Sequence, residues 1–443
     1  MRHLLRRPAR LLLLASLAAA AACGGRAARP AASTAPPPPP AAPLAADDEM
    51  VESTIRFLED RVRQDPLDFI AYNKLCGYYL QRQRETGDVQ YLELAARAAR
   101  ASLKAIPAEQ NAGGLAALAR TEFATHDFAS ARDHAQQLTK LEPRKSYPYE
   151  LLGDALLELG DYDGADAAFA QLERASGAQS LSASLRRARV YLLRGQTDEA
   201  RARYQVALAL ALDPVPPDRE TVAWCRWQLG EVAFGVGNYD EAERQYTDAL
   251  TTFPDYYRAL AGLGRVRAAR GDLPGAIARY EQVTKRLPDP VYVAALGDLY
   301  TLAGRGRDAQ AQYALVEQIA RLGALNGQLY NRQLALFYAD HDLKPAEAYE
   351  LAAREYEQRR DIYGADALAW AALKAGKLAE ARRAVGDALK LGTRDARLFY
   401  HAGLVARAAG DRAAAADYLK RALALNPQFD PLQARVAQRA LAE

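Results

Sequence analysis

The sequence predicts an all-α fold in which similar pairs of helices follow one another along most of the chain. Two observations lead to this prediction. One pattern of small, apolar and aromatic residues recurs past residue 66, and its glycines return at intervals close to one fixed length. The intervals are 35, 42, 34 and 33 residues for the series Gly160, Gly195, Gly237, Gly271 and Gly304. A sustained period of this length indicates a stack of repeated units.

The composition is that of a folded protein without a nucleic-acid partner. Of the 443 residues, 50% are hydrophobic and 26% are charged, which is ordinary for a globular chain. The formal net charge is +3, but the first 22 residues contain four arginines and no acid, so the remainder carries 3 − 4 = −1. A protein that binds nucleic acid normally has a basic excess. We therefore expect no binding to nucleic acid.

Residues 1–22 are predicted to be a signal peptide. Residues 2 to 10 are positively charged, and the 12-residue apolar run from Leu11 to Ala22 is too short to span a bilayer as a helix. The run ends in Ala20-Ala21-Ala22-Cys23-Gly24, which resembles the bacterial lipobox, although Leu is usual where Ala20 stands.

The lipobox resemblance implies that Cys23 is lipidated on its sulfur, becomes the mature N-terminus and anchors the chain to a membrane. Gly24 after it, rather than Asp, implies sorting to the outer membrane, where the chain would face the periplasm. The alternative is an ordinary A-x-A cleavage site followed by an incidental cysteine.

Residues 23–46 are predicted to be the lipidated cysteine and a flexible tether. The stretch is mainly Ala and Pro with consecutive prolines at 36–40, so it has little to bury and favours an extended backbone. At about 3.1 Å per residue it would hold the folded part up to about 70 Å from a lipid surface. Residues 47–68 are predicted to be an N-terminal capping helix, since acids begin it, apolar residues recur at helical spacing and Pro66 follows.

The clearest repeat runs Tyr149-x2-Leu152-Gly153-x2-Leu156, followed by Gly160, Tyr162 and Ala165-x3-Phe169. It resembles the tetratricopeptide repeat, a 34-residue helix-turn-helix unit. The resemblance implies a superhelical solenoid of about ten such units over residues 69–427, with residues 428–443 as a C-terminal capping helix. It also implies that the first helix of each unit, helix A, lines a concave groove. The units begin near residues 69, 112, 146, 181, 223, 257, 290, 328, 362 and 396.

Small residues stand where the two helices of a unit would touch. Gly153 and Gly230 on helix A, and Ala165 and Ala242 on the second helix, helix B, allow a close approach. A larger side chain would push the helices apart and strain the stack.

No pattern of catalytic or metal-binding residues stands out. The chain has five histidines, and His126 and His134 are eight residues apart, which is not the spacing of the HExxH zinc motif. Phosphate-binding, dinucleotide-binding and GxSxG motifs are absent from the sequence. Cys76 and Cys225 fall about four repeats apart, so we expect two free thiols. We expect no enzymatic activity, no metal and no cofactor, and a hydrolase within the superhelix is the alternative.

Position 9 of helix A alternates in charge over six consecutive repeats. Alternation lets neighbouring repeats pair their charges along the concave wall, so either a self-satisfied ladder or a site for a mixed-charge ligand results. The Lys and Asn set of the well-known clamp for acidic chaperone tails is absent. The six residues are Arg120, Asp154, Arg189, Glu231, Arg265 and Asp298.

Aromatic residues give a second set of candidates for binding a partner. Trp224, Trp227 and Phe234 fall at positions 2, 5 and 12 of the fifth repeat, and Trp370 is at position 9 of the ninth, beside Tyr363 and near Tyr400. Aromatic anchors are where interface energy concentrates. Packing of the tryptophans against the proline-rich link 214–217 is the alternative.

These features favour a non-catalytic scaffold or adaptor lipoprotein of the bacterial cell envelope. Its partners would be other envelope proteins or peptides, in the kind of role that lipoproteins of this build have in assembly or export machinery. The alternative is an envelope receptor that binds a peptide or a glycan in the concave groove.

Overall fold

The computed structural model describes residues 48–325 and 331–442. The predicted signal peptide, Cys23 and the tether lie outside the described residues. Within the described part, the chain contains 22 α-helices, one short 3-10 helix (Ala108–Gln110) and no strand. All of these helices belong to one unit of the chain, Pro40–Glu443.

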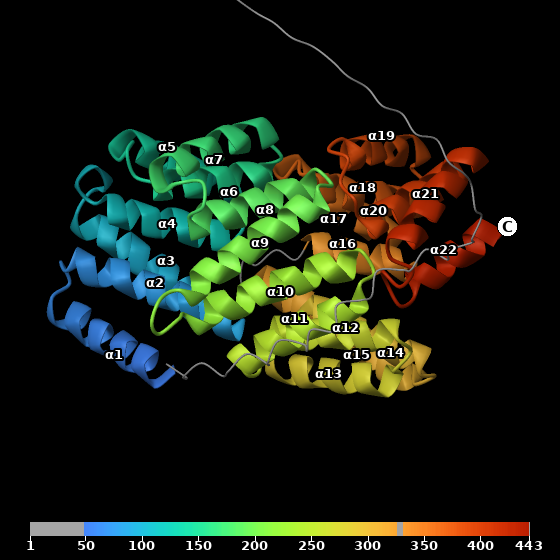
Figure 1. The fold of residues 1–443 in the computed structure, drawn as a ribbon, viewed down its shortest axis with the longest axis horizontal. Helices are drawn as coiled ribbons and strands as arrows, with labels where there is room; N and C mark the ends of the chain where they lie inside the picture. The colour runs from blue at the N-terminus through green and yellow to red at the C-terminus, as the bar shows by residue number, and fades with distance from the viewer. Residues whose placement is uncertain (1–47, 326–330, 443) are drawn as a thin grey trace, which may run out of the picture. The chain divides into compact units, whose positions relative to one another are not determined.

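The helices form ten antiparallel pairs between two single terminal helices, which confirms the predicted solenoid of about ten units (Figure 1). The terminal helices are α1 (Asp48–Gln64) and α22 (Gln433–Ala442). The first five pairs are α2 (Phe69–Thr86) with α3 (Gln90–Ala105), α4 (Ala112–Ala124) with α5 (Phe128–Leu141), α6 (Tyr147–Leu159) with α7 (Tyr162–Ser176), α8 (Leu181–Leu193) with α9 (Thr197–Leu212), and α10 (Arg219–Gly235) with α11 (Tyr239–Thr252). The last five are α12 (Tyr257–Ala269) with α13 (Leu273–Arg286), α14 (Pro290–Leu302) with α15 (Gly306–Leu325), α16 (Asn331–Asp340) with α17 (Pro345–Gln358), α18 (Ile362–Lys374) with α19 (Leu378–Leu389), and α20 (Ala396–Ala408) with α21 (Arg412–Leu425).

The turn between helices A and B has the same construction in five of the ten pairs. Gly160 adopts φ 80°, a left-handed conformation that glycine takes at little cost. Asp161 follows, and its carboxylate accepts a hydrogen bond of 2.9 Å from the backbone N–H of Gly164, which caps α7. The same order of a left-handed residue and a capping side chain recurs before α5, α11, α13 and α21.

Four glycines inside helix A, Gly153, Gly230, Gly264 and Gly297, face an aromatic ring of helix B. A Cβ atom added at Gly153 would lie within 3.0 Å of three atoms of the Phe169 ring, and one at Gly230 would meet Tyr246 in the same way. Both rings are almost fully buried. These contacts are the physical reason for the small residues that the sequence repeats at this position.

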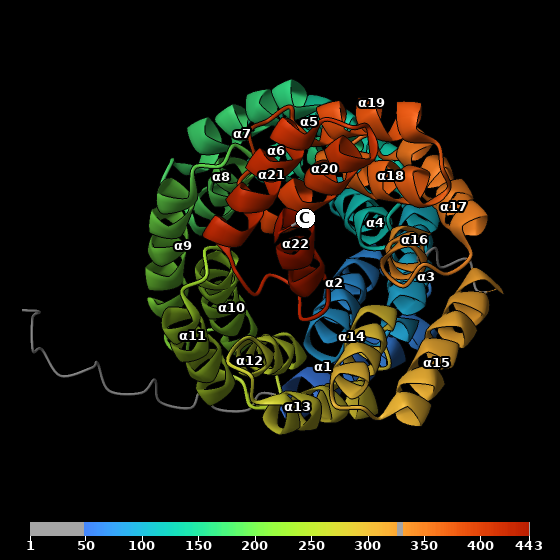
Figure 2. The ribbon, with the colours of Figure 1, turned by 90° about the vertical axis from the view of Figure 1, so that its right-hand side faces the viewer.

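The pairs wind into a superhelix whose successive turns touch. Figure 2 looks along its axis, with the pairs around the axis and α22 nearest to it. The backbone N–H of Ile362 donates to the hydroxyl of Tyr162, 200 residues earlier, and Thr393 donates to the carbonyl of Leu193 over the same separation. Asn426 donates to the carbonyl of Phe234 at 2.7 Å, 192 residues earlier. The third, fourth and fifth pairs therefore contact the connections that follow α17, α19 and α21.

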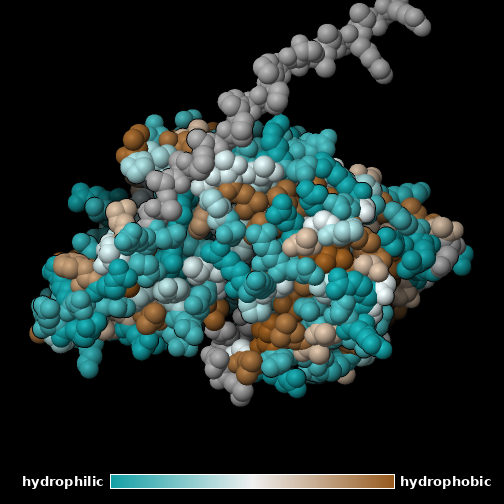
Figure 3. Space-filling model, turned by 90° about the horizontal axis from the view of Figure 1, so that it is seen from below, coloured by the Kyte–Doolittle hydropathy of each residue, from teal (hydrophilic) through white to brown (hydrophobic). Residues whose placement is uncertain are grey.

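Hydrophilic side chains predominate on the face of the molecule shown in Figure 3, and apolar ones form separate patches among them. No helix within residues 48–325 and 331–442 combines the length and the apolar character needed to cross a membrane.

Candidate functional site

The six residues of alternating charge lie on the first helices of consecutive pairs, but only two of them pair with each other within the described part of the chain. Glu231 forms an ion pair with Arg265 of the next repeat. Asp154 instead pairs with Arg186 at 2.8 Å, and Arg189 pairs with Glu158. The position-9 residues of neighbouring repeats therefore do not form a continuous ladder of ion pairs with one another.

The remaining two members of the set differ in how well they are satisfied. Asp298 lies 2.7 Å from His341 and accepts a hydrogen bond of 2.8 Å from the hydroxyl of Tyr313. Arg120 has no ion pair in the described residues, and its guanidinium lies 5.8 Å from the ring centroid of Tyr147. Five of the six charges are thus balanced inside the protein, which favours internal satisfaction over a site for a mixed-charge ligand.

The strongest charge cluster was missed by the sequence patterns because its members come from distant repeats. Glu158 of α6 pairs with both Arg189 and Arg359, the latter 201 residues later. Burial would raise the pKa of Glu158, but the two guanidinium groups outweigh it and lower the pKa to about 2. Asp361 lies 3.8 Å from Arg359 and forms an ion pair of 2.6 Å with Arg332, so the cluster extends to α16. The cluster holds two superhelical turns together.

Three of the predicted groove aromatics are buried, so the expectation that they line an open groove is wrong. Trp370 and Tyr400 are 0% exposed and Phe234 is 5% exposed. The indole of Trp370 donates to Asp340 at 2.9 Å and stacks on His401 at 4.5 Å between ring centroids.

The C-terminal segment accounts for the burial of Tyr400. Its hydroxyl donates to Gln433 of α22 at 2.7 Å, and its ring lies 5.4 Å from that of Phe429. Arg397 at the start of α20 pairs with Asp430 at 2.9 Å. The segment between α21 and α22 thus folds over helix A of the tenth pair. Tyr363, in contrast, is 39% exposed.

Trp224 and Trp227 of α10 are both partly exposed, as the sequence allowed. Their ring centroids are 6.3 Å apart, with an interplanar angle of 61°. Trp224 also lies edge-on to Tyr204 at 6.2 Å. The side chain of Val215 in the proline-rich link is 96% exposed, and the apolar clusters around the tryptophans include no residue of this link.

A cation, Arg258, lies against this tryptophan pair; Glu220 and Asp289 interact with it electrostatically, but no carboxylate of the described residues forms a direct ion pair with it. The guanidinium of Arg258 on α12 is 5.1 Å from the ring centroid of Trp227 and 5.1 Å from that of Tyr257. Cation–π contacts of this kind hold a guanidinium in place without neutralising its charge. We call the partly exposed residues Trp224, Trp227 and Arg258 the Trp227–Arg258 surface; the Tyr257 ring that also contacts Arg258 is buried.

The two cysteines of the described part are not activated as nucleophiles. Cys76 and Cys225 are free and buried, and burial raises the pKa of both thiols, that of Cys225 to about 12. A raised pKa removes the thiolate that a nucleophilic cysteine needs. Among the described residues, no group of three or more His, Cys, Asp or Glu side chains is placed to hold a metal ion.

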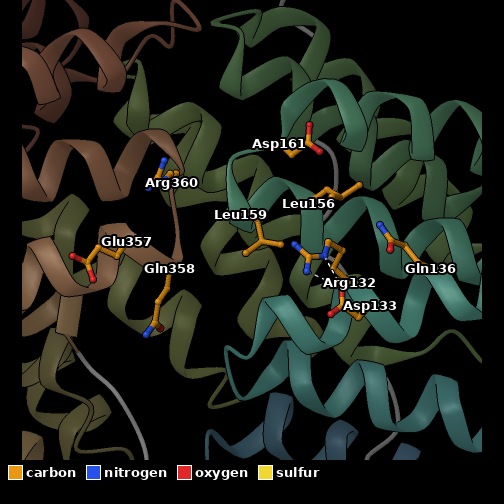
Figure 4. Close-up of a pocket in the computed structure, with 9 residues that line it drawn as sticks. All are labelled: Arg132, Asp133, Gln136, Leu156, Leu159, Asp161, Glu357, Gln358 and Arg360. Atoms are coloured by element: carbon orange, nitrogen blue, oxygen red, sulfur yellow. Dashed lines mark hydrogen bonds and ion pairs between the residues drawn. The ribbon is translucent and has the colours of Figure 1, made fainter.

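One cavity lies between two superhelical turns and has a volume of about 500 Å³. Figure 4 shows Arg132 and Asp133 of α5 and Leu159 of α6 on one side, facing Glu357 and Gln358 of α17 on the other. Some of its lining residues are more than 200 positions apart in the sequence. A local sequence pattern therefore could not predict this cavity.

Family models of the tetratricopeptide repeat match residues 179–255, residues 233–299, and residues 116–180 and 367–428. Solved structures that resemble the chain include a tetratricopeptide repeat protein from Parabacteroides merdae, with 17% identity, 60% of this chain and 98% of that chain covered, and a TM-score of 0.34. PilW, a widely conserved type IV pilus biogenesis factor, is 20% identical over 46% of this chain and 91% of its own, with a TM-score of 0.39. Yeast Tom70 is 13% identical over 89% of this chain and 93% of its own, with a TM-score of 0.38. No curated protein sequence matches the chain.

Proposed function

The chain is a tetratricopeptide-repeat protein, and on that premise we propose that it is a non-catalytic scaffold of the bacterial cell envelope that binds other proteins. Repeats of this kind suggest a surface for protein–protein interaction. The observation that carries the proposal is the Trp227–Arg258 surface, which α10 of the fifth pair and α12 of the sixth pair form.

This surface has the chemistry of an interface anchor. Tryptophan, tyrosine and arginine are the residues in which binding energy concentrates at protein interfaces. The rings hold Arg258 in one position, so little conformational entropy is lost when a partner's carboxylate pairs with it. A partner segment with an acidic side chain beside an apolar one would complement this surface.

The envelope part of the proposal rests on the N-terminal pattern. The apolar run ending at Cys23 supports export and lipidation, and the Ala- and Pro-rich residues after it support a tether long enough to present the repeats away from an outer-membrane surface. Replacing the cysteine tests this part: Cys23→Ser is expected to move the protein from the membrane fraction to the soluble envelope fraction with unchanged helicity by circular dichroism. Continued membrane association of the variant would contradict a lipid anchor.

Chemical crosslinking in intact cells followed by purification tests the scaffold itself. We expect the wild-type chain to recover one or more envelope proteins in near-stoichiometric amounts. Arg258→Glu is expected to lose them, because the reversed charge repels the partner's acid. Arg435→Glu on α22 is the matched control and is expected to keep them, since Arg435 is exposed and lies outside the surface.

Two outcomes would overturn the scaffold proposal. Recovery of the same proteins by wild type and Arg258→Glu would show that the Trp227–Arg258 surface does not bind them. Recovery of no protein, together with binding of a peptide or glycan that Arg258→Glu abolishes, would favour an envelope receptor instead.

A further inference from the structure

The two ends of the helix stack differ in the side chains that they expose to solvent. At the C-terminal end, α22 packs on α21 and presents Arg435, Gln438 and Arg439 to solvent. At the N-terminal end, four large apolar side chains are exposed: Met50 (65%), Phe57 (62%), Leu67 (70%) and Ile70 (52%). A terminal unit of a repeat stack needs a polar outer face to stay soluble alone. At the N-terminal end, these four apolar side chains are exposed beside the charged residues that α1 presents, such as Glu49, Arg56 and Asp60.

A cavity marks the place where a further helix would pack at this end. Its volume is about 470 Å³, and it lies between α1 and α2, lined by Thr54, Phe57, Leu58, Lys74, Gly77, Tyr78 and Gln81. A second cavity of about 280 Å³ continues along α2 toward α4 and shares Lys74 and Gly77 with the first. We call the first cavity the N-terminal seat.

Comparison with the later pairs identifies what the N-terminal seat accommodates. Lys74 and Tyr78 are the sixth and tenth residues counted from the start of α2, and the corresponding residues of α4 are Ala117 and Thr121. These two are buried against the preceding helix A, with the hydroxyl of Thr121 at 3.3 Å from the sulfur of Cys76.

The same two positions are buried in other pairs too, while Lys74 is exposed and Tyr78 partly exposed. The N-terminal seat therefore has the geometry of a place for a helix A, and this chain has no helix that fills it within the described residues. The buried counterparts are Gly262 and Val266 in α12, Ala367 and Ala371 in α18, and His401 and Val405 in α20.

Gly77 lines the N-terminal seat and leaves the backbone of α2 bare there. A glycine within a helix is less favourable than alanine because it loses more conformational freedom on folding. Gly153 and Gly230 contact a ring of helix B, whereas a Cβ atom at Gly77, as at Gly235 and Gly386, would meet nothing within 4 Å. The bare backbone at Gly77 leaves room for an atom that is not part of the described chain.

Charge defines the occupant further. Lys74 is the one charged residue that lines the N-terminal seat, and Arg120 is the one that lines the second cavity besides Lys74. Neither has an ion pair in the described residues, and neither cavity is lined by an acid. An occupant with an acidic side chain beside an apolar stripe complements both features.

We propose that the N-terminal seat binds an amphipathic helix of another protein, which stacks on α1 and α2 as a helix A of a preceding unit would. Its apolar stripe packs against Phe57, Leu58 and Tyr78, a side chain lies over Gly77, and a carboxylate pairs with Lys74. This site is separate from the Trp227–Arg258 surface, so either can fail without the other.

Fluorescence polarisation with a defined probe tests the chemistry of the seat. The probe is a labelled, stapled 14-residue helical peptide with leucines on one face and glutamates elsewhere, and its matched peptide has lysine in place of glutamate. We expect the glutamate peptide to bind the full chain at least tenfold more tightly than the lysine peptide. Gly77→Met and Lys74→Glu are each expected to weaken it at least tenfold.

Two control variants make the same kinds of substitution outside the N-terminal seat, so they show whether a change in peptide binding is specific to that cavity. Gly386→Met changes a glycine of α19 that also has nothing within 4 Å, and Lys420→Glu reverses an exposed charge on α21. Both are expected to bind the glutamate peptide as wild type does. Gly77→Met is expected not to lower the thermal midpoint, so weaker binding would not reflect unfolding. Equal binding by wild type, Gly77→Met and Lys74→Glu would overturn the proposal.

Site-specific photocrosslinking identifies the occupant in cells. With p-benzoylphenylalanine in place of Phe57, the proposal predicts a crosslink to a helical segment of a different protein that carries acids beside an apolar face. A crosslink to a second copy of this chain, to residues 24–46 of the same chain, or to lipid alone would each contradict it. Loss of this crosslink would leave the Trp227–Arg258 test unaffected, which distinguishes the two proposals.

Discussion

The hydroxyl oxygen of Tyr162 accepts a hydrogen bond of 2.8 Å from the backbone N–H of Ile362, 200 residues further along the chain. Tyr162 is the first residue of α7 and Ile362 the first of α18, so the bond joins the third and ninth pairs directly. The N–H groups at a helix start have no partner within the helix. One superhelical turn thus satisfies a backbone donor of the next.

Tyr162→Phe is expected to destabilise the protein by about 1 kcal/mol, because the N–H of Ile362 loses its acceptor in a partly buried place. Tyr149→Phe is the matched control: its hydroxyl donates to the carbonyl of Pro143 in an exposed place, so its loss should cost less. Urea unfolding followed by circular dichroism measures both. Equal free energies of unfolding for Tyr162→Phe and wild type would show that this hydrogen bond between superhelical turns does not stabilise the fold.

The contact between turns is also expected to depend on pH through Glu158. Its pKa is about 2 in the folded protein and 4.5 without the fold, so the ionised group stabilises the fold above pH 4.5 and loses this effect as the pH falls toward 2. A pKa difference of this size corresponds to about 3 kcal/mol.

Glu158→Gln tests this pH dependence. Because the variant has no proton to gain, its unfolding free energy should fall less than that of wild type between pH 5 and pH 2.5. Glu357→Gln is the control, since Glu357 is exposed and has no ion pair in the described residues. Parallel pH profiles for wild type and Glu158→Gln would contradict the role of the Glu158–Arg359 pair.

Two glycines of helix A are expected to respond to alanine with opposite signs. Gly153→Ala should destabilise by about 1–3 kcal/mol, because the added methyl group overlaps the buried ring of Phe169. Gly77→Ala should stabilise by about 0.5–1 kcal/mol, because the methyl group meets open space and the helix gains propensity. Differential scanning calorimetry checks both. A lower midpoint for Gly77→Ala would show that Gly77 has an internal role after all.

The sequence predicted the helix pairs well because each repeated position has a local reason. The turn at Gly160 has a left-handed backbone conformation that favours glycine, and the ring of Phe169 leaves no room for a side chain at Gly153. Both requirements arise within one unit. The charged side chains were harder to place. Asp154 faces Arg186 rather than Arg189, since the reach of a long side chain decides the pair rather than its register on the helix.

Contacts between distant parts of the chain left no signal in the sequence. Tyr400 is buried because α22 folds inward, and the repeat pattern does not encode the direction of a terminal helix. The Glu158–Arg359 pair depends on the pitch of the superhelix, which accumulates from small rotations between many units. A slightly different rotation per unit would separate the two turns while leaving every repeat intact.

The affinity of a purified envelope partner for Trp227→Ala tests most directly whether the Trp227–Arg258 surface binds another protein. We predict a Kd about 30-fold higher than for wild type, equivalent to about 2 kcal/mol, with a thermal midpoint within a few degrees of wild type. A variant that melts many degrees lower yet keeps its wild-type Kd would show that Trp227 serves the core and that the partner binds elsewhere.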